Sequence, residues 1–139
     1  MDESHWAIDV DKYSSENISQ LMKIKADIFD ALGKENKPTD TLITKIMLGV
    51  FGNVPAFDNN FKAAFHVSSL NPTALRTITE YYEKQKEIIN SHNFTTMDFT
   101  TGLDTNIKYT KAKIIDMIGF IEGIIIEANK PKKNGKGTE

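Results

Sequence analysis

Three charged residues occupy positions where the surrounding helical patterns favour apolar ones. Lys25 falls within the apolar stripe of one predicted helix, and Lys45 falls in a helix that is apolar on nearly every side. Glu122 lies between Ile118 and Ile125 in a third. A buried lysine–glutamate pair would have shifted protonation and could mark a functional pocket. More often such lysines extend along apolar surface to water and the glutamate pairs locally, which is the interpretation we favour.

Lys45, Asp58 and Glu122 are the residues that an enzyme could bring together in one pocket. Asp58, beside Asn59 and Asn60, could act as an acid, but it also stands where a capping residue would begin a helix. No residues have the spacing of a phosphate loop or of a nucleophile with its base. The chain has no cysteine, which excludes disulfides, thiolate zinc sites and cysteine nucleophiles. We therefore assign no catalytic residue and no cofactor, and favour a protein that is not an enzyme.

The three histidines predict no metal site. His5, His66 and His92 are far apart, and none has a second ligand at helical spacing. The helical ribonucleases of the higher-eukaryote and prokaryote nucleotide-binding class need an arginine closely followed by a histidine. The single arginine, Arg76, has no histidine before His92, so this enzyme class is excluded.

Lysine clusters indicate an alternative function, in which the protein is a nucleic-acid-associated accessory protein. One cluster comprises Lys108, Lys111 and Lys113, and the tail carries the candidate phosphate contacts Lys130, Lys132, Lys133 and Lys136. Such contacts would be weak, salt-sensitive and independent of base sequence. With four lysines and one glutamate, residues 129–139 carry +3, so the net charge of −2 leaves −5 on the first 128 residues. This acidic body weakens the nucleic-acid interpretation.

The composition is that of one globular domain. The chain has 139 residues, of which 40% are hydrophobic and 26% charged. The first 13 residues are acidic and polar, unlike a secretory signal, so we expect a cytoplasmic protein. The longest apolar stretch, 114–126, contains two acids and is shorter than the roughly 20 residues of a membrane span.

Helical periodicity and capping residues predict most of the elements. The expected helices run from Ser14 or Ser15 to Leu32, from Asp40 to Phe51, from Asp58 through Phe65, from Pro72 to about Asn90, and from Asp104 or Thr105 to Ala128. Residues 91–106 are rich in threonine and form a loop that short strands could occupy. Phe57, Phe61 and Phe65 fall four residues apart, so their rings should line one face.

Glycines at short spacing favour close helix packing. Gly119 and Gly123 are four residues apart, and Gly49 and Gly52 three. In water this spacing more often means packing inside a domain than a dimer seam. The last helix is nevertheless the best candidate interface, with contacts at Ile114, Ile118, Gly119, Phe120 and Gly123.

One region resembles a known family. The residues are Thr44-Lys45-Ile46, Leu48-Gly49, Phe51-Gly52, Pro55-Ala56, Asp58 and Phe61, followed by Lys113-Ile114-Ile115-Asp116-Met117. Over about residues 41–120 this pattern is similar to the second half of an uncharacterised family of bacterial helical proteins without known activity. The resemblance implies a motif of Lys45, Gly49, Gly52, Pro55, Asp58 and Phe61. Family members carry a preceding helical segment rich in tryptophan and leucine, where this chain has only Trp6 and its first helix, so the resemblance implies a shortened or split form whose apolar face a partner covers.

Together these patterns predict an all-α fold, a compact bundle-like domain of four or five helices over residues 14–128. Residues 1–13 are expected to be a flexible segment and residues 129–139 a disordered basic tail. The second and last helices should form the centre. The leading functional hypothesis is a non-catalytic protein–protein interaction module that associates with itself or with a protein partner, without a membrane.

Overall fold

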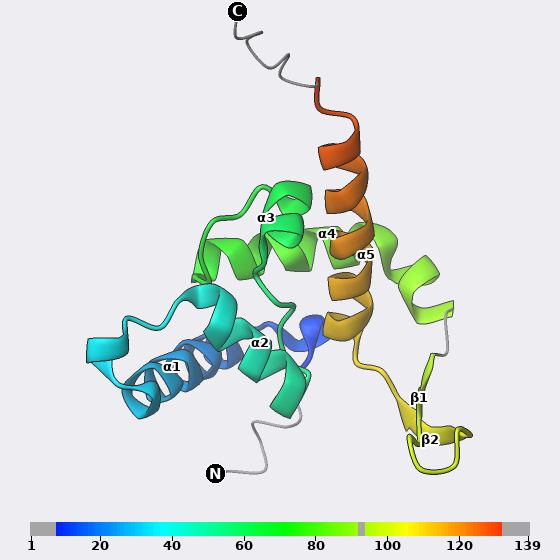
Figure 1. Cartoon of the computed structure of the whole chain (residues 1–139), viewed down its shortest axis with the longest axis horizontal. Coiled ribbons are helices and arrows are strands. Elements are labelled where there is room, and N and C mark those ends of the chain that lie inside the picture. The colour runs from blue at the N-terminus through cyan, green and yellow to red at the C-terminus, as the bar shows by residue number, and fades with distance from the viewer. Residues whose placement is uncertain (1–7, 92–93, 132–139) are drawn as a thin grey trace, which may run out of the picture.

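The computed structural model describes residues 8–91 and 94–131, which form five α-helices and one two-stranded hairpin (Figure 1). The helices are α1 (Ser15–Leu32), α2 (Asp40–Phe51), α3 (Asn59–Phe65), α4 (Pro72–Ser91) and α5 (Lys111–Ala128), and the antiparallel strands are β1 (Thr95–Met97) and β2 (Asp104–Lys108). Short 3-10 helices span Val10–Lys12 and Lys34–Asn36. The predicted helical fold is confirmed, with the hairpin as a small addition.

The predicted capping residues begin and end the helices. Ser14 caps α1, and the carboxylate of Asp58 accepts a hydrogen bond of 2.9 Å from the backbone N–H of Phe61 at the start of α3. Asn71 accepts one of 2.8 Å from Ala74 in α4. Gly52 ends α2 with φ 64°, a left-handed conformation that glycine adopts without strain. These caps are local, so short sequence patterns suffice to predict them.

The most extensive helix pair is α3 against α5. As predicted, the three phenylalanine rings form one row: Phe57 and Phe61 have ring centroids 5.2 Å apart, and Phe61 and Phe65 stack at 4.5 Å. Phe57 and Phe61 are fully buried. This row fixes the short helix α3 onto α5.

The start of the domain lies earlier than predicted. Ile8, Val10 and Tyr13 are buried, and the Tyr13 hydroxyl donates a 2.5 Å hydrogen bond to the backbone carbonyl of Asn53. Residues 8–13 are therefore part of the core and not of a flexible segment. The sequence pattern does not indicate this burial, because Asp9 and Asp11 lie between the buried residues and give the segment a polar composition.

The last helix starts later than predicted. Residues 104–108, expected in its first turns, form β2 instead, and Thr110 caps α5 by accepting from the N–H of Lys113 at 3.2 Å. The hairpin turn is closed by Asp98, whose N–H donates to Leu103 and whose carbonyl accepts from Gly102. β-branched Thr105 and Ile107 favour the strand over the helix.

The second and last helices are less enclosed than predicted. Ile43 and Met47 of α2 are fully buried, but Val50 is 48% exposed. The last turn of α5, after Gly123, extends beyond α3 (Figure 1). Within residues 8–91 and 94–131, no helix has the length and apolar character that crossing a membrane requires.

Candidate functional site

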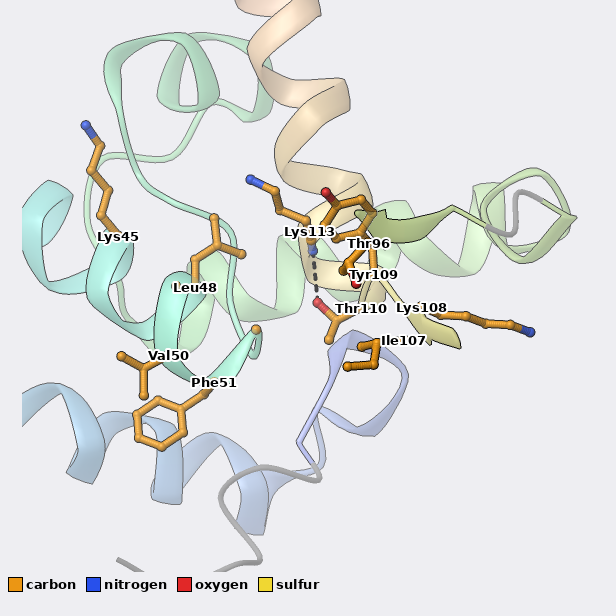
Figure 2. A pocket seen from close by; sticks show the side chains of 12 residues that line it. Lys45, Leu48, Val50, Phe51, Thr96, Ile107, Lys108, Tyr109, Thr110 and Lys113 are labelled. Carbon is orange, nitrogen blue, oxygen red and sulfur yellow. Dashed lines mark hydrogen bonds between the residues drawn. The ribbon is translucent and has the colours of Figure 1, made fainter. Parts of the chain in front are cut away.

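A groove of about 520 Å³ separates the end of α2 from the hairpin and the start of α5. Its walls are mainly apolar, and Figure 2 shows Leu48 and Val50 on the α2 side opposite Ile107, Tyr109 and Thr110. The elements that shape it are the Gly52 cap, which stops α2, and the Thr110 cap, which starts α5. Because Ile107 is 68% exposed and Val50 about half exposed, the groove is open to solvent along its length.

Three lysines stand at this groove: Lys45, Lys108 and Lys113. Lys45 and Lys113 lie on opposite sides and point the same way, whereas Lys108 is directed outward (Figure 2). Lys113 forms an ion pair of 3.5 Å with Asp116. Lys45 and Lys108 have no ion pair with any described residue. The groove therefore has an apolar floor and a positively charged rim.

The two glycines of the groove differ. A Cβ on Gly52 would lie 2.8 Å from Cγ2 of Thr110, so the close approach of α2 to the start of α5 requires this glycine. A Cβ on Gly49 would meet nothing within 4 Å. Gly49 is inside a helix, where glycine costs roughly 1 kcal/mol relative to alanine. Nothing within the described fold compensates for that cost.

Asp116 fastens the loop after α2 to α5. Its carboxylate accepts a 3.0 Å hydrogen bond from the N–H of Ala56, 60 positions earlier in the chain. Burial raises the pKa of Asp116, which the hydrogen bond from Ala56 and the charge of Lys113 oppose. The nearby carboxylate of Asp58 adds a smaller increase in this pKa. Asp116 therefore connects the loop between α2 and α3 to α5, whose residue Lys113 lines the groove.

The structure does not bring the three candidate catalytic residues together. Lys45 lines the groove, while Asp58 caps α3. Glu122 is exposed on α5 and lies near the phenol of Tyr81, whose pKa is raised by partial burial and then by this carboxylate. Lys25, the third charged residue in a predicted apolar stripe, forms an ion pair of 3.3 Å with Asp40 and donates a hydrogen bond of 2.8 Å to the carbonyl of Leu70. The lysine–glutamate pair is therefore not formed.

Metal ligands do not converge in the part of the chain that the structure describes. Residues 8–91 and 94–131 contain no group of three histidines or carboxylates that could hold an ion. His66 is exposed and ends α3 in a left-handed conformation. His5 and His92 lie outside the described residues.

Gly119 and Gly123 of the candidate interface pack against α3 of the same chain. A Cβ on Gly119 would lie 2.6 Å from Cδ2 of Phe61, and one on Gly123 would lie 2.4 Å from the backbone oxygen of Asn60. Ile114 is buried as well, Ile118 is half-buried, and Phe120 is half-exposed. Both glycines and Ile114 are thus occupied by packing within the chain, which corrects their assignment as contacts for a partner.

The exposed apolar surface of α5 is instead formed by five positions, of which only Phe120 is among the predicted contacts. These are Phe120 at 49% exposure, Ile121 at 57%, Ile124 at 47%, Ile125 at 53% and Ile126 at 37%. Every residue from 124 to 131 is exposed. The sequence signal was the run of three isoleucines, 124–126, but periodicity alone cannot tell a helix that crosses a core from one that leaves it.

The described lysines near α5 are mostly paired. Lys111 lies 3.9 Å from Asp11, and Lys130 bonds to Glu127 at 2.8 Å. Lys132, Lys133 and Lys136, the other candidate phosphate contacts, lie outside the described residues. The pairing lowers the positive charge that phosphates would meet on this face.

Comparison with family models, with curated proteins and with solved structures finds no match for this chain. The resemblance to the second half of a bacterial helical family remains a prediction. Of its motif, Lys45, Gly49 and Gly52 line the groove, whereas Asp58 and Phe61 cap and anchor α3.

Proposed function

We propose that this chain is a non-catalytic protein–protein interaction module that associates with itself through the exposed half of α5. The single observation that carries the proposal is the burial pattern of that half: five large apolar side chains between residues 120 and 126 are exposed on α5, whose last turn extends beyond α3 (Figure 1). A helix face that carries several large apolar side chains is normally packed against another element. The partner that buries this one is a second copy.

The size of the exposed surface supports this role. A large apolar side chain offers roughly 200 Å² when fully exposed. Phe120, Ile121, Ile124 and Ile125 share one side of the helix and together expose roughly 400 Å², within the range of the largest patches found on monomeric proteins, which are often functional. Only two acids, Glu122 and Glu127, interrupt the surface, and Glu127 is neutralised by Lys130. Burial of such a surface favours association at moderate protein concentration.

The test compares two isoleucine-to-lysine variants of similar exposure. Ile125→Lys alters the proposed surface, and Ile88→Lys alters α4, where Ile88 is 58% exposed. We expect light scattering to give a mass above that of the monomer for the wild type and for Ile88→Lys, and a monomer mass for Ile125→Lys. Equal masses for all three proteins would refute the role of α5. A Gly119→Leu variant is unsuitable, because its side chain would collide with Phe61.

Salt separates this function from nucleic-acid binding. Apolar association persists or strengthens at high salt, whereas phosphate contacts weaken steeply. Light scattering at low and high salt, together with the ratio of absorbances at nucleic-acid and protein wavelengths, distinguishes apolar association from nucleic-acid binding. A species that carries nucleic acid at low salt and is a bare monomer at high salt would contradict the proposal.

A further inference from the structure

The groove beside α2 has features that indicate an occupant. Val50 and Ile107 expose apolar surface there, and Lys45, which has no ion pair with the residues that the structure describes, places a positive charge on its rim. Gly49 leaves the helix surface open, where an alanine would stabilise the helix without meeting any atom. Glycine on a helix permits the close approach of another backbone, so these features fit a helix more closely than a small molecule.

The exposed end of α5 has the complementary chemistry. It offers Ile121, Ile124 and Ile125 as apolar contacts and Glu122 as an exposed acid. The groove offers an apolar floor with Lys45 at its rim. Opposite charges around an apolar contact favour one partner and one orientation.

The end of α5 cannot reach the groove of its own chain. Lys113, in the first turn of α5, lines the groove, and Ile124 lies eleven residues later, about 16 Å along a rigid helix at 1.5 Å per residue. Figure 1 shows the far end of α5 pointing away from α2 and the hairpin. The end of α5 and the groove of the same chain therefore never meet.

From this complementarity we infer that the end of α5 of one copy docks in the groove between α2 and the hairpin of the next copy. This inference rests on the proposed self-association and names the surface that receives α5. The contact is heterologous, because two different surfaces meet, so it continues from copy to copy until a ring closes or a chain grows. A symmetric pairing of two α5 helices would leave the groove empty.

The experiment uses one variant for each surface. Gly49→Trp fills the groove and keeps α5 intact, and Gly49→Ala is its matched control, because it removes the same glycine and leaves most of the groove open. Ile125→Lys keeps the groove and disables α5. We expect Gly49→Ala to weaken association only slightly, because one methyl group takes little of the space that a docked backbone needs, and Gly49→Trp to raise the dissociation constant by at least about tenfold, which corresponds to roughly 1.4 kcal/mol.

Mixing the two defective proteins gives the decisive result. The intact α5 of Gly49→Trp should dock in the intact groove of Ile125→Lys and form a one-to-one heterodimer that grows no further. If Gly49→Trp associates like the wild type, or if the mixture stays monomeric although each variant is folded by circular dichroism, the inference is wrong. A wild type that is monomeric at every concentration would instead refute the proposed self-association itself.

A second variant covers the case in which Gly49→Trp fails to fold. Lys45 is exposed and has no ion pair with any residue within 8–91 and 94–131, so Lys45→Glu leaves the domain intact while it reverses the charge at the rim. We expect weaker association for Lys45→Glu, and unchanged association for a matched Lys84→Glu on α4. Equal association of the two charge reversals would overturn the inference.

Discussion

The carboxylate of Asp9 accepts hydrogen bonds from the backbone N–H groups of Ala112 at 3.0 Å and Lys111 at 2.9 Å, although more than 100 residues separate them. It also accepts from the N–H of Val10 at 2.7 Å. A helix leaves its first N–H groups without partners in its own backbone, and a carboxylate at that end is additionally favoured by the helix dipole. Asp9 thus joins the start of the domain to the start of α5 and positions one side of the groove.

We expect Asp9→Ala to lower the free energy of unfolding by about 1–3 kcal/mol, because two N–H groups at the start of α5 lose their acceptor. Asp9→Asn keeps one acceptor oxygen and should lose less. Urea denaturation of the three proteins measures the difference. Equal stability of wild type and Asp9→Ala would show that water replaces these hydrogen bonds at no cost.

The pH dependence of stability follows from the same residue. Burial raises the pKa of Asp9, and its three backbone donors oppose the rise. The folded state therefore takes up this proton at a higher pH than the unfolded chain, whose aspartates titrate near about 3.9. Protonation of Asp9 therefore stabilises the folded state. This contribution is complete below the pKa of Asp9 in the unfolded chain and is lost as the pH rises through its pKa in the folded state. Relative to Asp9→Asn, the wild type should gain stability as the pH falls from 7 towards about 4; a relative loss would mean that the hydrogen bonds outweigh burial.

Thr44 provides a test of a buried hydrogen bond. Its hydroxyl is fully buried, donates to the carbonyl of Asp40 at 2.6 Å and accepts from the N–H of Phe57 at 2.8 Å. Thr44→Val keeps the shape and leaves the Phe57 N–H without a partner, which should cost about 1–3 kcal/mol. Thr44→Ser keeps the hydroxyl and should retain most of the stability in thermal unfolding. A valine variant as stable as the wild type would contradict this account.

Alanine at two helical glycines should have opposite effects. Gly49→Ala should stabilise the protein by up to about 1 kcal/mol, because its Cβ meets no atom and the helix is favoured. Gly123→Ala should destabilise it, because its Cβ would meet the backbone of Asn60 at 2.4 Å and the backbone cannot move aside cheaply. Thermal unfolding of both variants measures the two signs. The same sign for both would show that the helices do not pack as described.

Sequence reasoning predicts the elements whose signals are local. The caps at Ser14, Asp58 and Asn71 and the row of phenylalanines follow from spacings of three or four residues. The contact of Asp9 with α5 depends on tertiary structure and has no local signature. For the candidate site, sequence reasoning points to Lys45 and Gly49, but it predicts a helix over residues 104–108, which form one strand of the hairpin on the opposite wall.

The exposed half of α5 could not be predicted for a different reason. Its isoleucines have the composition of a core helix, and only the positions of the other helices show that the contact of α5 with α3 ends at Gly123. A sequence pattern indicates which residues favour burial. It does not indicate whether the same chain or a second chain buries them. The two glycines were correctly associated with close packing, and the structure shows the partner to be α3.

The measurement that tests the central claim most directly is sedimentation equilibrium of the wild-type protein over a wide range of concentrations at high salt. If a second copy buries the exposed half of α5, the average mass rises with concentration above the 15.7 kDa of one chain. The associated protein then contains no nucleic acid. A mass that stays at one chain at the highest concentrations would contradict the account.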